Sequence, residues 1–285
     1  MERGCRLQSD DPWICDGIGG GASVRLIRYP DGQASAVVDG CLSGCDVTIC
    51  SRMSGFGAVQ DIACVASAVR SAKAKSVSLR VPYFLGARSD RSFGEGTTNY
   101  LKDVICPIIN GLNFKKVEIL DPHSDVLPAL LKRVEVIPLD GFYRWCGEVL
   151  DFRGVQPVVV CPDAGAQKRA MKFAQVCGLE DVVCCSKDRD VQTGEITRIS
   201  IPVEDFDRRP VVIVDDICDG GATFMAVAME INNRNSGPKT LVVTHGIFSK
   251  GFGDLRLIFD RVLCTDSLNP VWMDSIVTRY EIYGE

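Results

Sequence analysis

Apolar positions along the chain follow two periods, one typical of strands and the other of helices. Residues 24–39 alternate apolar and polar side chains on both sides of Pro30-Asp31-Gly32, which predicts a hairpin closed by a tight turn. A short strand is expected at 47–50, a helix at 58–74, where apolar residues recur at helical spacing, and a strand at 77–81. This stretch therefore predicts a hairpin followed by a βαβ unit.

The same alternation continues to residue 244 and predicts two α/β halves. Strands are expected at the apolar runs 117–120, 134–137, 158–161, 182–185, 211–214 and 241–244. Helices are expected at 98–109, shortly after Ser124, at 165–176 and at 221–231. Helices interleaved with short apolar strands predict mostly parallel sheets covered on both faces. We expect two consecutive α/β domains, 1–145 and 146–285.

Composition excludes several classes of protein. The chain has 285 residues, 46% hydrophobic and 24% charged, which suits a globular protein with a substantial core. Its formal charge of −5 argues against a nucleic-acid partner, because such proteins carry net or clustered positive charge. The sequence has no apolar run long enough to span a membrane, and residues 1–11 are polar and charged. We expect a cytoplasmic protein without a membrane partner.

The 14 cysteines are spread along the chain, and many lie inside apolar runs. There is no CxxC pair, and the spacing of Cys41, Cys45 and Cys50 does not match a zinc site. Cys184 and Cys185 are expected to point to opposite faces of a strand. We interpret the cysteines as reduced residues of the core.

The most informative segment follows the predicted strand 211–214, where two acidic residues lead into a loop of small residues and then a helix. Backbone N–H groups of such a loop can approach phosphate oxygens closely, and the helix N-terminus favours an anion. The acidic pair can accept hydrogen bonds from ribose hydroxyls. An ordinary turn with Asp219 as helix cap is the alternative. The predicted ribose-phosphate site comprises Asp215, Asp216, Asp219, Gly220, Gly221, Ala222 and Thr223.

An apolar strand, two acids and a small-residue loop ending in Thr resemble the signature of the type I phosphoribosyltransferase superfamily. Other segments resemble one of its branches, the phosphoribosyl pyrophosphate synthetases, in the order that this family has them. The matching segments are R-Y-P-D-G-Q at 28–33, P-Y-F-L-G-A-R-S-D-R at 82–91, D-P-H-S at 121–124, C-P-D-A-G at 161–165, S-K-D-R at 186–189 and T-H-G-I-F-S at 244–249.

The resemblance implies an enzyme that moves the β,γ-diphosphate of ATP onto the anomeric hydroxyl of ribose 5-phosphate. Such a reaction requires positioning and stabilisation of negative charge. Lys187 and Arg189 are the implied catalytic cations, and His123 and Asp163 would position Mg²⁺. The implied ATP-binding residues are Tyr29, Asp31, Gln33, Arg88, Ser89, Asp90, Arg91 and His123. For His245 the sequence leaves structural support and ligand contact as equal alternatives.

The resemblance also implies a homo-oligomer in which the hairpin at Asp31 serves the ATP site of a neighbouring subunit. The chain departs from the family's D-D-x-x-D-T-x-G-T loop, because Gly220 stands at the first Thr and Ala222 at the Gly. Loss of the threonine would open space beside the sugar phosphate, so ADP-ribose is an alternative acceptor, in a route to NAD. Two further alternatives are a phosphoribosyltransferase and a non-catalytic regulatory paralogue.

Overall fold

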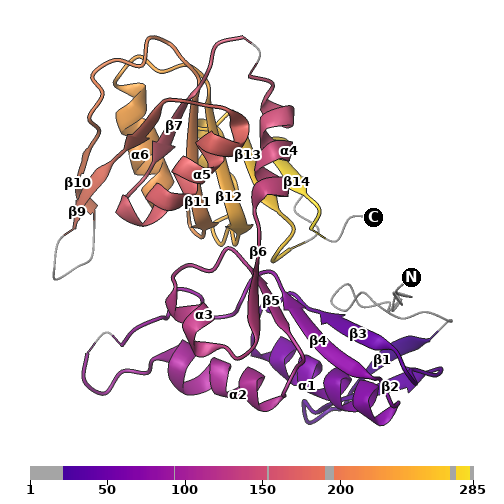
Figure 1. Ribbon diagram of the computed structural model, residues 1–285. Helices are drawn as coiled ribbons and strands as arrows, with labels where there is room; N and C mark the ends of the chain where they lie inside the picture. Colours follow the sequence, from indigo (N-terminus) through magenta and orange to yellow (C-terminus); the bar gives the residue numbers. More distant parts are fainter. Residues whose placement is uncertain (1–21, 93, 153, 190–195, 270–273, 283–285) are drawn as a thin grey trace. The chain divides into compact units, whose positions relative to one another are not determined.

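The computed structural model describes residues 22–92, 94–152, 154–189, 196–269 and 274–282. The chain divides into two compact units between Ile137 and Pro138 (Figure 1). The second unit includes helix α4 (Asp140–Leu150), so residue 145, where the sequence places the domain boundary, falls inside a helix. In both units strands alternate with helices along the chain, which confirms the predicted α/β class.

A four-stranded parallel sheet forms the centre of the first unit, in the order β3-β4-β5-β6. The predicted N-terminal hairpin is confirmed, and it pairs antiparallel outside this sheet. The strands of the unit are β1 (Ser23–Arg28), β2 (Ala34–Asp39), β3 (Asp46–Cys50), β4 (Ser76–Val81), β5 (Val117–Leu120) and β6 (Val134–Ile137). Its helices are α1 (Phe56–Ser71), a π-helical turn (Leu101–Ile105), α2 (Cys106–Gly111) and α3 (Val126–Leu130).

The core of the first unit lies on one face of its sheet. Alternate strand residues such as Ile49, Leu79 and Ile119 are fully buried and belong to one cluster with the apolar residues of α1 and α2. The opposite face carries charge, since Arg80 Nε donates to Glu118 Oε2 at 2.9 Å. Polar side chains therefore occupy several positions of this face, although Glu118 itself is only 6% exposed.

The second unit contains a six-stranded parallel sheet in the order β14-β13-β12-β11-β7-β8. Alternate residues of its strands enter two different cores, one with α4 and α5 and one with α6, which confirms cover on both faces. The strands are β7 (Val158–Cys161), β8 (Val182–Cys184), β11 (Val211–Cys218), β12 (Lys239–Gly246), β13 (Arg261–Thr265) and β14 (Val277–Tyr280). The remaining helices are α5 (Gln167–Cys177) and α6 (Ala222–Asn232), with one-turn 3₁₀ segments at Ala164–Ala166 and Leu255–Leu257.

No disulfide joins two cysteines among the described residues. Cys184 packs against the core with α4 and α5, whereas the adjacent Cys185 belongs to the core with α6. The sequence prediction that this pair points to opposite sides of the sheet is confirmed.

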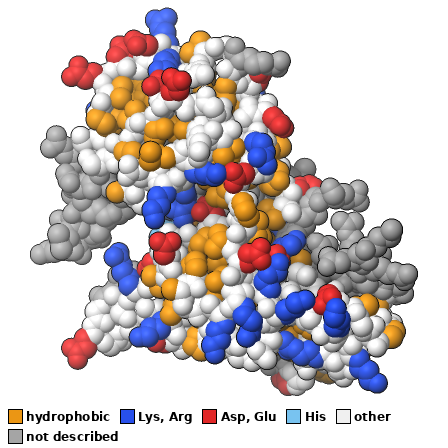
Figure 2. Space-filling view, viewed as in Figure 1, with side chains coloured by type: hydrophobic (Ala, Val, Ile, Leu, Met, Phe, Trp, Pro, Cys, Tyr) orange, Lys and Arg blue, Asp and Glu red, His pale blue; other side chains and the backbone are white. Residues whose placement is uncertain are grey.

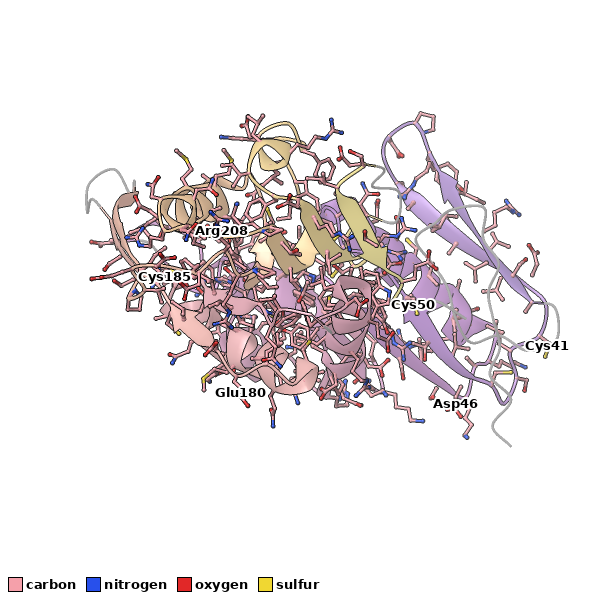
Figure 3. All side chains as sticks on the ribbon, turned by 90° about the horizontal axis from the view of Figure 1, so that it is seen from above. Cys41, Asp46, Cys50, Glu180, Cys185 and Arg208 are labelled. Atoms are coloured by element: carbon pink, nitrogen blue, oxygen red, sulfur yellow. The ribbon has the colours of Figure 1, made fainter. Side chains whose placement is uncertain are left out.

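The two edges of the first sheet differ in chemistry. At the amino end of β3, Asp46 Oδ2 lies 3.1 Å from Lys75 Nζ and Asp46 Oδ1 lies 3.3 Å from Lys115 Nζ. Figure 3 labels Asp46 and Cys50, which are the two ends of this strand. Figure 2 shows many Lys and Arg side chains on the surface of the first unit. Exposed ion pairs such as those of Asp46 contribute little stability individually. Ligands of parallel sheets bind instead at the carboxyl ends of the strands.

Among the described residues, no helix has both the length and the apolar character needed to cross a membrane.

Candidate active site

The acidic pair of the second unit lies on a strand. The sequence prediction ended this strand at Val214, but β11 continues to Cys218, and Asp215 pairs in register with Val243 of β12. The backbone N–H of Asp216 donates to Asp215 Oδ1 at 2.8 Å. The two carboxyl groups are therefore fixed by the sheet at its carboxyl edge.

The two acids have different surroundings. Asp216 is 3% exposed, and its Oδ2 lies 3.5 Å from a guanidinium nitrogen of Arg169 on α5. Asp215 is only half-buried. Asp216 therefore fixes α5 against the strand, and Asp215 is the more accessible acceptor for sugar hydroxyls. Sequence reasoning missed Arg169, although a basic residue on the helix after the C-P-D-A-G segment is a usable signal.

Burial of the Asp215 carboxyl, together with the neighbouring carboxyl of Asp216 and a contribution from Asp163, raises its pKa from 3.8 to about 8. Arg169 compensates the charge of Asp216, so ionisation of Asp215 as well needs a further cation or hydrogen-bond donors. The site thus favours a ligand that brings hydroxyl donors or a cation to Asp215.

The small-residue loop after β11 has the backbone that an anion site needs. Gly221 is the N-cap of α6 with φ of 80°, a conformation that glycine adopts without strain. A Cβ placed on Gly221 would also lie 3.1 Å from the Leu255 side chain. The first turn of α6 begins at Ala222, contains Thr223 and carries no acidic residue, so its N–H groups favour an anion.

Asp219 is not the helix cap, because Gly221 occupies that position. Its Oδ1 accepts a hydrogen bond from Ser249 Oγ at 2.5 Å instead. The interpretation of this segment as an ordinary turn capped by Asp219 is therefore wrong, since Asp219 joins this loop to the T-H-G-I-F-S segment.

The T-H-G-I-F-S segment is tied to the end of β11 by backbone hydrogen bonds. The N–H groups of Ile247 and Phe248 both donate to the carbonyl of Cys218, at 2.8 and 3.1 Å. Phe248 is 2% exposed and its ring packs on Phe252, with centroids 4.7 Å apart. A Cβ on Gly246 would lie 2.1 Å from the Phe248 ring, so only glycine leaves room for this packing.

We expect Gly246→Ala to destabilise the protein by about 1–3 kcal/mol, because the added methyl overpacks a buried ring. The measurement is urea unfolding of the variant and the wild type. Gly253→Ala is the matched control, since a Cβ at Gly253 meets nothing within 4 Å. Equal unfolding midpoints for the two variants would contradict the account of this loop.

His245 lies inside the protein. It is 2% exposed, and its Nδ1 lies 2.8 Å from the Oγ of Ser267, which is fully buried. Thr265 Oγ1 donates to the carbonyl of Thr244 at 2.5 Å, so the same group of residues joins the ends of β12 and β13. Of the two alternatives for His245, the structure favours structural support.

Asp163 follows β7 at the same edge of the sheet. Its Oδ1 accepts from the backbone N–H of Gly165 at 2.9 Å and of Ala166 at 3.2 Å, which caps the turn leading into α5. Among the described residues no three His, Cys, Asp or Glu side chains could hold a metal ion together. Asp163 and Asp215 offer the oxygen ligands that Mg²⁺ prefers, and substrate phosphates would have to complete its coordination.

The first unit brings its predicted ATP-binding segments to the carboxyl ends of β4 and β5. Arg88 and Arg91 are exposed and Ser89 and Asp90 half-buried after β4, while His123 is exposed just after β5. Because β4 and β5 are parallel neighbours, these segments meet at one edge of the sheet. A buried arginine follows β3 at this edge as well, Arg52, which is 6% exposed. Sequence reasoning missed Arg52, and a charged residue directly after an apolar strand is the signal for it.

The hairpin carries the other predicted ATP-binding residues at its tip. Tyr29 is 44% exposed, and Asp31 and Gln33 are exposed too. Asp31 Oδ1 accepts from the N–H of Gln33 at 3.0 Å, and Arg28 holds the base of the tip through Asp61 of α1, at 2.5 Å. The three side chains are thus presented on a braced turn.

The predicted catalytic segment forms a second hairpin. β9 (Ser186–Arg189) pairs antiparallel with β10 (Ile196–Ser200), a region in which no strand was predicted. The side chains of Lys187 and Arg189 lie outside the described residues. Their catalytic role stays a prediction.

The second unit matches a family model described as the phosphoribosyl transferase domain, over residues 144–247. The ribose-phosphate pyrophosphokinase of Vibrio parahaemolyticus is 26% identical over 88% of this chain and 79% of its own length. The one of Sulfolobus acidocaldarius is 24% identical over 86% of this chain and 85% of its own. A phosphoribosylpyrophosphate synthetase structure from Mycobacterium smegmatis has the same fold, with a TM-score of 0.79 at 17% identity over 92% of this chain and 87% of that one. The chain is thus similar to ribose-phosphate pyrophosphokinases over most of its length, and residues 144–247 match the phosphoribosyl transferase domain.

Proposed function

We propose that the protein transfers the β,γ-diphosphate of ATP to the anomeric 1-hydroxyl of ribose 5-phosphate, giving phosphoribosyl pyrophosphate and AMP. The observation that carries this proposal is the pair of joined loops at the carboxyl edge of the second sheet. They place the half-buried Asp215 at the end of β11, next to a glycine loop and the first turn of α6. An acceptor for sugar hydroxyls beside a backbone anion site suits a ribose phosphate.

The chain supplies three kinds of group to this reaction. The loop 219–221 and α6 would bind the 5-phosphate, while Asp215 would accept hydrogen bonds from the ribose hydroxyls. Lys187 and Arg189 on β9 would stabilise the charge of the moving diphosphate. The 1-hydroxyl oxygen loses its proton to solvent and forms the new bond to the β-phosphorus, the bond between this phosphorus and the oxygen that bridges to the α-phosphorus breaks, and AMP leaves with that oxygen.

The first unit would bind ATP. Arg88 and Arg91 are exposed cations at the carboxyl edge of its sheet, and His123 lies at the end of the adjacent strand. Mg²⁺ bound with the ATP phosphates would neutralise part of their charge. Asp163 of the second unit offers the oxygen contacts that Mg²⁺ prefers, directly or through water, whereas a role of His123 in orienting the ion stays a prediction.

Assembly and location follow from the same proposal. The exposed hairpin tip with Tyr29, Asp31 and Gln33 suits a role in the ATP site of a neighbouring copy of the chain. We therefore propose a cytoplasmic homo-oligomer. Light scattering after size-exclusion chromatography measures the oligomer directly, and a monomer at micromolar concentration would contradict shared sites.

The first test uses purified protein with ATP, Mg²⁺ and one acceptor at a time, either ribose 5-phosphate or ADP-ribose. We expect AMP to form with ribose 5-phosphate, at a rate that depends on acceptor concentration. AMP with ADP-ribose alone would overturn the proposed acceptor. Consumption of phosphoribosyl pyrophosphate with a free base, without AMP from ATP, would replace the proposal with a phosphoribosyltransferase.

A further inference from the structure

Lys250 lies across the phosphate loop. Hydrogen bonds from Ile247, Phe248 and Ser249 hold the loop after β12 against Cys218 and Asp219. This fold carries the next residue over Gly220, where a Cβ would lie 3.3 Å from both Cδ and Cε of Lys250 and 3.5 Å from its Cγ. A side chain at position 220 would therefore make a tight contact with the stem of Lys250, which would have to shift by a few tenths of an ångström.

This contact corrects the interpretation of Gly220. The sequence suggested that the missing threonine opens room beside the sugar phosphate, which motivated the larger acceptor ADP-ribose. The aliphatic part of Lys250 fills that room instead. Gly220 is thus explained by a lysine 30 residues further along the chain, without an enlarged acceptor.

The charges around the loop require a cation for a phosphate dianion. Asp219 lies in the loop that would bind the phosphate, and the nearby Arg169 is already paired with Asp216 at 3.5 Å. Lys250 is exposed, and the described residues give it no salt bridge. Its four-carbon stem rests on Gly220, so its ammonium group is delivered next to the loop.

Building on the proposed function, we infer that Lys250 binds the 5-phosphate of the acceptor sugar through its ammonium group, in place of a hydroxyl donor at position 220. Gly220 and Lys250 then act as a pair, because the absence of a side chain at position 220 lets the lysine stem rest on the loop. This pair of residues selects acceptors with a phosphomonoester dianion over neutral sugars.

The test compares Lys250→Met and Lys250→Ala with the wild type. Methionine retains an apolar stem over Gly220 without the charge, so a phosphate role predicts that both variants lose affinity alike. We expect KM for ribose 5-phosphate to rise about 10- to 100-fold, as for loss of a charge-assisted hydrogen bond, with KM for ATP unchanged. Turnover of ribose without a phosphate should not change. Lys172→Ala, which removes an exposed lysine paired with Asp140 on the same unit, is the matched control.

Position 220 supplies a second, independent readout. We expect Gly220→Thr to weaken ribose 5-phosphate binding, because the new side chain displaces Lys250. Adding Gly220→Thr to Lys250→Ala should instead recover part of the lost affinity, since the threonine hydroxyl then has room. A Lys250→Met variant with wild-type KM, or purely additive effects at the two positions, would overturn the inference.

Calorimetric titration of ribose 5-phosphate separates this inference from the proposed function. A wild type that binds ribose 5-phosphate but forms no AMP would contradict the proposed function. The dissociation constants of the Lys250 variants would then still test whether Lys250 binds the phosphate. A wild type that does not bind ribose 5-phosphate would overturn both. AMP formation with unchanged KM in Lys250→Met would overturn the lysine's role alone.

Discussion

Lys187→Ala is expected to lower kcat for AMP formation by on the order of 100- to 1,000-fold, because it removes a cation that stabilises charge in the transition state. KM for ATP and for ribose 5-phosphate should change little, as for an interaction made mainly in the transition state. Steady-state kinetics with both substrates varied is the measurement. Arg189→Ala should have an effect of the same kind, since the two residues share β9.

Lys172→Ala controls for the loss of a lysine from the second unit, because its partner Asp140 lies outside the candidate site. Circular dichroism of each variant checks that the fold is retained. A Lys187→Ala enzyme with wild-type kcat would contradict a catalytic role of the β9–β10 hairpin.

Asp215→Asn is expected to weaken acceptor binding and to abolish proton release on binding. Burial beside Asp216 raises the pKa of Asp215 to about 8, so the free protein holds this proton at pH 7. Hydrogen bonds from ribose hydroxyls favour the carboxylate, so binding releases about one proton. Affinity should therefore increase as pH rises from 6 to 8 in the wild type and stay level in the variant.

Calorimetry of ribose 5-phosphate binding in buffers of different ionisation enthalpy counts the protons. Asp181→Asn, which changes an acid paired with Arg209 away from the loop, should release as many protons as the wild type. No proton release by the wild type at pH 7, or equal release by Asp215→Asn, would contradict the role of Asp215.

The raised pKa of Asp215 also affects the free energy of unfolding, which should decrease with pH where acceptor affinity increases. Between the unfolded pKa of 3.8 and the folded value of about 8, the native protein holds a proton that the unfolded chain has lost. The free energy of unfolding should therefore fall as pH rises through this window, by at most about 1.4 kcal/mol per pH unit from this group. Asp215→Asn should flatten that part of the profile, which urea unfolding at several pH values can measure.

Much of the architecture could be predicted from short buried runs. The strands at 117–120, 134–137 and 158–161 have the predicted bounds, and β5 and β7 are buried at every position. The length of β11 was underestimated, because Asp215 and Asp216 interrupt its apolar run. The strand nevertheless continues to pair with its parallel neighbour β12 beyond these residues. The predicted helix at 98–109 begins as a π-helical turn before α2, where Pro107 has no N–H to donate.

Elements that depend on distant contacts were missed. The charged run around Lys187 gave no strand signal, and β9 exists through its pairing with β10. β14 is a partly exposed edge strand, which lacks the apolar run of a central one. The contact between Gly220 and Lys250 could not be predicted for the same reason, since Lys250 meets Gly220 only through the fold of the loop after β12. Local patterns predict the candidate site, whereas long-range contacts determine which of its residues are accessible.

The stoichiometry of the reaction tests the proposed diphosphate transfer most directly. ATP and ribose 5-phosphate are incubated with the protein and Mg²⁺, and nucleotides and sugar products are quantified by mass spectrometry over the reaction. We expect one AMP for each ribose that gains two phosphates, with Lys187→Ala as the inactive control. Formation of ADP with a singly phosphorylated product, or of AMP without a diphosphorylated sugar, would contradict diphosphate transfer.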